Sequence, residues 1–125
     1  MSIAGLDLLF LEVNSMEESL QFYVELLGFQ ITSSNPDAEP PLASLRVGKL
    51  KITLVQQLET MLRRGRGVNF FFGVDDVDEY YKTLVERDAQ IRPPIDEGWG
   101  GRFITLQDPD NYRLFFVTWS DQLKP

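Results

Sequence analysis

The chain has 125 residues, 43% of them hydrophobic and 25% charged, a composition typical of one soluble, globular domain. Its formal net charge of −7 opposes nucleic-acid binding, which normally needs a basic surface, and suits a cationic ligand or simply solubility. The absence of histidine and cysteine excludes serine–histidine–aspartate triads, cysteine nucleophiles and histidine-based metal sites. Carboxylate, lysine or tyrosine acid–base chemistry remains, as does a carboxylate site for magnesium or calcium.

The first half of the chain predicts a strand, a helix, a strand and a hairpin. Residues 6–13 are strand-like, Ser15 and Glu18 form a capping box that begins a helix, and Gly28 ends it. Apolar side chains recur at helical spacing on one face of this helix: Met16, Leu20, Tyr23, Val24 and Leu27. The ranges that follow predict a short strand (29–32), a proline-rich loop (33–41) and two hairpin strands (42–47 and 50–56).

A basic segment separates this half from the next. Residues 57–67 end in the run Arg63, Arg64, Gly65, Arg66 and Gly67. We interpret the segment as a solvated linker, and an anion-binding role is the alternative.

The second half repeats the order of elements. Residues 68–74 predict an aromatic-rich strand, and Asp76 with Glu79 begins a helix over 77–87. A short strand at 89–91 and a break at Pro93 and Pro94 follow. The last hairpin consists of residues 102–107 and 112–118, joined by a turn over Asp108–Asn111.

The two halves read as an internal duplication. The apolar helix positions Val77, Tyr81, Leu84 and Val85 follow Met16, Leu20, Tyr23 and Val24 by 61 residues. We therefore predict an α+β fold in which one domain, residues 1–125, contains two βαβββ modules at about 1–61 and 66–120. Each module covers one sheet face with its helix, so the two curved mixed sheets are expected to surround a cavity.

Several motifs in this order and spacing resemble the vicinal-oxygen-chelate superfamily of glyoxalase I, extradiol dioxygenases and bleomycin-resistance proteins. They are Phe22-Tyr23, Leu26-Leu27-Gly28-Phe29, Val74-Asp75-Asp76-Val77, Gly100-Gly101-Arg102 and Asp108-Pro109-Asp110-Asn111, and the resemblance covers nearly the whole chain. In the enzymes of that family, four strands each supply a histidine or glutamate to one divalent metal ion. The corresponding positions are Leu8, Thr53, Asn69 and Phe115, which are poor ligands, so we expect neither a metal ion nor another cofactor.

The chain is most similar to the metal-free bleomycin-resistance branch, in view of its acidity and the segment from Trp99 to Arg102. That resemblance implies a homodimer that binds drugs in grooves between the two chains. Asn111 and Tyr112 stand where the family usually has glycine and asparagine, and asparagine tolerates the left-handed backbone of such a turn. The expected partners are a second copy and a small aromatic or cationic molecule.

Strand alternation predicts which side chains line the cavity, because residues two apart share a face. The inward set is Leu8, Phe10, Glu12, Thr53, Val55, Gln57, Asn69, Phe71, Phe115 and Val117. The set packed under the helices is Leu9, Leu11, Val13, Phe70, Phe72, Leu114 and Phe116. The parity of residues 102–107 stays open. The candidate ligand-binding residues are Trp99, Phe10, Glu12, Asn69, Phe71, Arg102 and Phe115.

Each candidate also has a structural interpretation. The phenylalanines could fill a collapsed core, Glu12 could pair with Arg46 or Arg102, Trp99 could pack against the sheet or a dimer interface, and Asn69 could be a core amide.

The function predicted first is metal-independent binding of a small molecule, as in antibiotic sequestration. The alternatives are a lyase or isomerase that uses Glu12 or a tyrosine without metal, and a ligand-free structural or regulatory dimer. The chain has no basic leader or long apolar run, so we expect a cytoplasmic protein that contacts no membrane.

Overall fold

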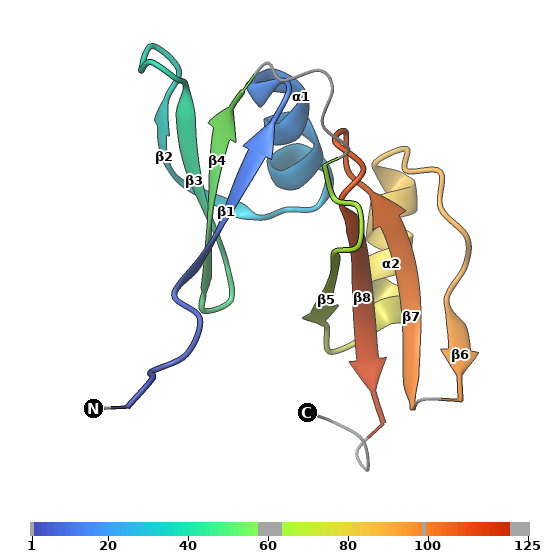
Figure 1. Ribbon diagram of the computed structural model, residues 1–125. Helices are drawn as coiled ribbons and strands as arrows, with labels where there is room; N and C mark the ends of the chain where they lie inside the picture. The colour runs from blue at the N-terminus through green and yellow to red at the C-terminus, as the bar shows by residue number, and fades with distance from the viewer. Residues whose placement is uncertain (1, 58–63, 99, 121–125) are drawn as a thin grey trace. The chain divides into compact units, whose positions relative to one another are not determined.

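The fold repeats one supersecondary unit twice. A computed structural model describes residues 2–57, 64–98 and 100–120, and the chain divides into two compact units, Met1–Leu62 and Arg63–Pro125. Each unit contains a strand, a helical segment and three further strands in that order (Figure 1). Each forms a four-stranded mixed sheet, which confirms the predicted fold class of two βαβββ modules.

The first unit begins with β1 (Leu8–Val13), the helical turns α1 (Met16–Leu20) and η1 (Gln21–Leu26), and β2 (Gln30–Asn35). The hairpin of β3 (Leu42–Val47) and β4 (Leu50–Gln56) completes it with the predicted boundaries. The strand order is β1-β4-β3-β2, in which β1 runs parallel to β4 and the other pairs are antiparallel.

The second unit has the same topology. It contains β5 (Asn69–Gly73), α2 (Val77–Glu86), β6 (Ile95–Glu97), β7 (Gly101–Gln107) and β8 (Arg113–Trp119). The strand order is β5-β8-β7-β6, and β5 runs parallel to β8. A parallel pair needs a crossover connection, and the helix supplies it in each unit.

The core of each unit lies between the sheet and its helix. In the second unit the ring of Tyr80 on α2 packs on Phe116 of β8, with ring centroids 4.9 Å apart. Leu84 of α2 is fully buried. The predicted parity is confirmed for the strand residues on this side, since Leu11, Val13, Leu114 and Phe116 are buried and Leu9, Phe70 and Phe72 are half-buried.

Both helices begin as their sequences predict. The Ser15 hydroxyl oxygen accepts from the Glu18 amide at 3.2 Å, and the Asp76 carboxylate accepts from the amides of Asp78 and Glu79 at 3.1 and 3.2 Å. Such caps satisfy amides that have no partner within the helix.

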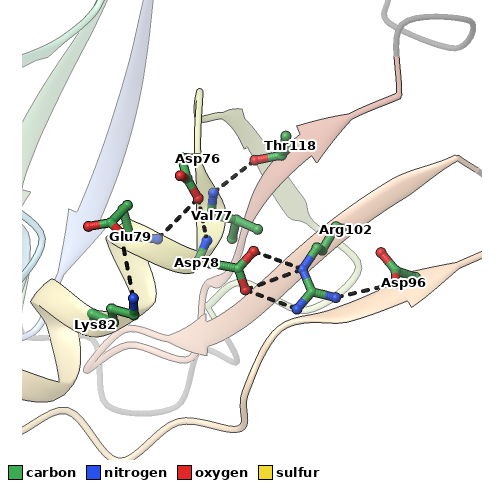
Figure 2. A network of polar contacts seen from close by, with 8 residues as sticks. All are labelled: Asp76, Val77, Asp78, Glu79, Lys82, Asp96, Arg102 and Thr118. Atoms are coloured by element: carbon green, nitrogen blue, oxygen red, sulfur yellow. Dashed lines mark hydrogen bonds and ion pairs between the residues drawn. The ribbon is translucent and has the colours of Figure 1, made fainter.

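The last strand of each unit supplies a second cap. The amide of Met16 donates to Oε1 of Gln56 at 2.8 Å, and the amide of Val77 donates to Oγ1 of Thr118 at 2.9 Å (Figure 2). The Thr118 hydroxyl donates in turn to the Val74 carbonyl at 3.0 Å. Each unit therefore ties the start of its helix to its last strand by a side chain on that strand.

Three local predictions were wrong. The first helix becomes a π-helix after Leu20, with an i to i−5 bond from the Leu27 amide to the Phe22 carbonyl at 2.9 Å. β2 continues to Asn35, into the segment that was predicted as loop. The short strand expected at 89–91 lies at 95–97 instead, because its pairing with β7 places it after the two prolines.

The basic segment is also not wholly solvated. Among its described residues, Arg64 is buried and forms an ion pair with Asp110, at 3.7 Å between Nη1 and Oδ1. Their side chains are only 5% and 1% exposed. The start of the second unit thus docks on the β7–β8 turn.

That turn has the backbone predicted for it. Oδ1 of Asp108 accepts from the amides of Asp110 and Tyr112 at 2.9 and 2.8 Å. Asn111 has a φ of 69°, which is the left-handed conformation that asparagine tolerates. The described helices include none that is long and apolar enough to cross a membrane.

Candidate functional site

The sheet of the second unit has one face that α2 does not cover, which we call the open face. Strand pairing places Phe71, Phe115 and Thr105 in one row across it. The next row holds Gly73, Val117, Phe103 and Ile95, and the row after that holds Trp119, Gly101 and Glu97. This register settles the parity left open by the sequence, because residues 101, 103, 105 and 107 share the open face.

Three phenylalanines on the open face form what we call the aromatic platform: Phe71, Phe103 and Phe115. The rings of Phe71 and Phe115 are stacked, with centroids 4.4 Å apart and planes 2° from parallel. Phe103 adds a tilted contact to Phe115 at 5.4 Å. Phe71 remains 50% exposed, so its side chain presents apolar aromatic surface to solvent. Such a surface suits the planar ring of a ligand.

Two other predicted residues lie on this face and differ in exposure. Asn69 is exposed and precedes Phe71 by two positions on the same strand. Val117 also lies on this face, with the predicted parity, and is fully buried.

The candidates Phe10 and Glu12 belong to the first unit, on the face of its sheet opposite α1. Phe10 is 59% exposed and pairs with Thr53, whose Oγ1 lies 3.4 Å from Oγ of Ser44. Glu12 is half-buried and stands opposite Val55, which is buried. The structure therefore groups Phe71 with Phe115 in one unit and Phe10 with Glu12 in the other.

Arg102 lies on the helix side of its sheet. Its Nη2 and Nε donate to the Asp78 carboxylate at 2.9 and 3.1 Å, and its Nη1 donates to Asp96 at 3.3 Å (Figure 2). Arg102 thus connects the first turn of α2 with β6 and β7, on the sheet face opposite to Phe71 and Phe115. The hydrogen bond from Arg102 lowers the pKa of Asp78 below its ordinary value.

A pocket of about 360 Å³ lies where the ends of β6, β7 and β8 meet. Among the described residues, those that line it are Asp96, Glu97, Gly100, Gly101, Arg102, Thr118, Trp119 and Ser120. Trp119 was not among the predicted site residues, although the alternation from Phe115 through Val117 continues to it. Trp99, the candidate from the neighbouring loop, lies outside the described residues.

Residues 5–116 match the family model of the Glyoxalase/Bleomycin resistance protein/Dioxygenase superfamily. The chain belongs to this superfamily. The matched residues span both units, so the resemblance inferred from the motifs is confirmed at the level of the superfamily. No curated protein sequence matches the chain significantly.

Solved structures with the same fold include members from several bacteria. TnmS3, an antibiotic binding protein from Streptomyces sp. CB03234, is 26% identical with a TM-score of 0.78, covering 96% of this chain and 99% of its own. A superfamily member from Sphaerobacter thermophilus is 30% identical with a TM-score of 0.69, covering 93% and 98%. A third, from Nocardioides, has a TM-score of 0.78 and 22% identity over 100% and 89%, and shows the fold alone.

The residues at the superfamily's metal-ligand positions do not fit a divalent cation. Leu8 has no donor atom, and the ring of Phe115 is stacked on Phe71. Thr53 and Asn69 offer only neutral oxygens, which bind such cations weakly without carboxylates. Within the described ranges, no three acidic side chains gather where they could hold a metal ion.

Proposed function

We propose that this protein binds a small aromatic molecule without metal and without transforming it, as an antibiotic-sequestering member of its superfamily. The observation that carries the proposal is the stacked pair of Phe71 and Phe115. One ring of this pair is half exposed, and the other occupies a metal-ligand position of the enzymes. Where those enzymes would hold a cation, this chain presents an apolar aromatic surface.

The comparison with TnmS3 supports the ligand class. That protein is an antibiotic binding protein and shares 26% of aligned residues with nearly the whole of this chain. The proposal includes a cytoplasmic homodimer and places this chain in the bleomycin-resistance branch, on the strength of the motifs shared with that branch.

The alternative function, an enzyme that uses a tyrosine without metal, has less support from Tyr80. Tyr80 packs on Phe116 on the helix side of the sheet, away from the open face. Burial raises the pKa of its hydroxyl well above the ordinary value, which makes proton transfer near neutral pH harder.

A thermal-shift titration with bleomycin, followed by mass spectrometry of the recovered drug, tests the proposal. A ligand that binds only the folded state at a hundredfold excess over Kd stabilises it by about 2.7 kcal/mol. The expected result is a saturating rise in melting temperature with unchanged drug. A panel of planar aromatic antibiotics extends the assay. Chemical conversion of a bound compound would overturn sequestration in favour of catalysis, and absence of binding across the panel would overturn both.

A further inference from the structure

Two cations stand opposite each other in the sheet of the first unit, on the face that α1 leaves uncovered. Arg46 of β3 pairs with Lys51 of β4 in the antiparallel register, and both residues are exposed. The same row continues with Gln30 on β2 and Leu8 on β1, neither of which is charged. Like charges directly opposite each other in a strand pair are destabilising, and an anion bound between them would remove that repulsion.

Within the described part of the chain, no acidic side chain forms an ion pair with either cation. Glu12, the partner considered for Arg46 from the sequence, lies on the same face but in the row of Val55 and Leu42. Leu42 and Arg46 are four positions apart on β3, which is about 13 Å along an extended strand. The register therefore leaves Arg46 and Lys51 available to an external anion.

The place of the two cations in the sheet argues against a protective role. Charged side chains, lysine above all, commonly keep the edge strand of a sheet from pairing with another chain. β3 and β4 are the two inner strands of the order β1-β4-β3-β2, so neither presents an edge (Figure 1). Protection of an edge thus gives no reason for Arg46 and Lys51.

This face of the first sheet also differs in charge from the chain as a whole. Its strand residues carry two positive groups, Arg46 and Lys51, and one negative group, Glu12, which gives a net charge of +1. The whole chain carries −7, so a long polyanion such as a nucleic acid would be repelled. A small anion is different, because charges beyond about 8 Å are largely screened at physiological ionic strength. The charge distribution therefore favours a small ligand with one anionic group.

The neighbouring row supplies hydroxyl groups and an aromatic ring. Ser44 and Thr53 are opposite each other, two positions from Arg46 and Lys51, with Oγ and Oγ1 3.4 Å apart. Phe10 stands opposite Thr53 on β1 and is 59% exposed. Rows two positions apart are separated by about 7 Å along a strand, so a ring that rests on Phe10 can bring its carboxylate to the two cations.

We propose that this face binds the carboxylate of a small aromatic acid between Arg46 and Lys51, with the aromatic ring of the ligand against Phe10. A guanidinium group can donate two parallel hydrogen bonds to a carboxylate, and an ammonium group adds a compact charge. The inference goes beyond the proposed function and is independent of it, because that function rests on Phe71 and Phe115 of the second unit. It assigns an anion to a chain whose overall charge suits a cation.

Isothermal titration calorimetry with two probes of one shape tests the inference. Naphthoate carries the carboxylate, and naphthamide replaces it with a neutral amide of similar size. The titrations use the full chain with Phe71→Leu, which removes the exposed ring of the aromatic platform, so that binding to the first unit is measured. At neutral pH and in a buffer without phosphate, we expect naphthoate to bind about tenfold more tightly than naphthamide.

Variants added to this background locate the site. Arg46→Gln and Lys51→Gln should each abolish most of the preference for naphthoate and leave the affinity for naphthamide unchanged. Lys49→Gln, in the turn of the same hairpin, removes the same charge from an exposed position and is the matched control, which should keep the preference. Phe10→Leu should weaken both probes by a similar factor, because both place the same ring on Phe10.

Three results would overturn the site: equal affinity for the two probes, a preference that survives in both Arg46→Gln and Lys51→Gln, or an equal loss in Lys49→Gln, which would mean a diffuse attraction. If naphthamide binds the unaltered protein and neither probe binds the Phe71→Leu chain, the inference fails and the proposed function stands. If the naphthoate preference is found but Phe71→Leu leaves the affinity for naphthamide unchanged, the proposed function fails and the inference stands.

Discussion

The backbone of Gly65 lies against the carbonyl of Asn111, so closely that a Cβ built on Gly65 would come within 2.5 Å of that oxygen. The residue also has a φ of 74°, which side chains rarely adopt. We expect Gly65→Ala to lower the free energy of unfolding by about 3 kcal/mol, from backbone strain and steric overlap together. Urea denaturation measures the loss.

Gly48→Ala is the matched control for this prediction. Gly48 also has a positive φ, of 57°, but a Cβ there would meet no atom within 4 Å. Gly48→Ala should therefore lower the free energy of unfolding only by the backbone strain, about 1 kcal/mol. Equal losses at the two sites would show that the contact with Asn111 contributes nothing.

The buried ion pair of Arg64 and Asp110 leads to a second prediction. Arg64→Ala leaves a carboxylate that is 1% exposed without its cation, which should lower the free energy of unfolding by about 3 kcal/mol. Arg66→Ala, in the same basic run but exposed, should change it by less than about 0.5 kcal/mol. The double variant Arg64→Met with Asp110→Leu should recover much of the loss in chemical denaturation, because neither position of the pair then carries a charge. A double variant less stable than Arg64→Ala would contradict this account.

The interaction between Asp78 and Arg102 predicts a pH dependence of stability. Because Arg102 lowers the pKa of Asp78 in the folded state, the stabilisation is complete above the unfolded value near 3.8 and is lost as the pH falls through the lower folded value. Asp78→Asn should thus be less stable than the unaltered protein at neutral pH, and the difference should shrink in acid.

Urea midpoints recorded from neutral to acid pH measure this difference. The pKa of Arg102 is raised in the folded state, so its contribution is fully present throughout this range. Arg102→Gln also loses the ion pair with Asp96, so it should lose at least as much stability as Asp78→Asn with the same direction of pH dependence. The double variant should lose little more than Arg102→Gln. Additive losses would mean that the two side chains act independently.

Phe71 offers a test of binding with little effect on folding, because its side chain is half exposed. Phe71→Leu removes the ring that faces solvent and should weaken binding of an uncharged naphthyl amide about tenfold. Phe71→Tyr keeps the ring and should retain most of the affinity. Calorimetric titration gives both values, and equal affinities would argue against stacking on Phe71.

Thr118 and Gln56 predict parallel effects in the two units. Thr118→Val removes the acceptor for the Val77 amide, and Gln56→Leu removes the acceptor for the Met16 amide. Each should lower the free energy of unfolding by about 1.5 kcal/mol. Thr83→Val, which removes only an exposed hydrogen bond to the Glu79 carbonyl, should have a smaller effect in the same thermal and urea measurements.

The parts of the fold that depend on neighbouring residues were predictable from the sequence. The capping residues Ser15 and Asp76, the turn at Asn111 and the hairpin strands Leu42–Val47 and Leu50–Gln56 follow from local alternation and turn chemistry, and all are found. β6 was misplaced because a three-residue strand carries no alternation, and only its pairing with β7 defines it.

The candidate site was predictable only in part. Alternation correctly placed Phe71 and Phe115 on one face, since strand periodicity is local. The position of Arg102 depends on Asp78, and the burial of Arg64 depends on Asp110, which is 46 positions away in the chain. No local sequence pattern predicts a partner so distant in the chain. Trp119 was overlooked because the last strand extends one residue beyond its predicted end.

The caps provided by Gln56 and Thr118 show what duplication leaves unchanged. One unit uses an amide and the other a hydroxyl, yet both side chains present an oxygen to the first amide of their own helix. The fold thus requires a hydrogen-bond acceptor at the end of the last strand rather than a particular amino acid. In a repeated chain of this type, a lone polar residue closing an apolar strand marks where one copy of the unit is complete.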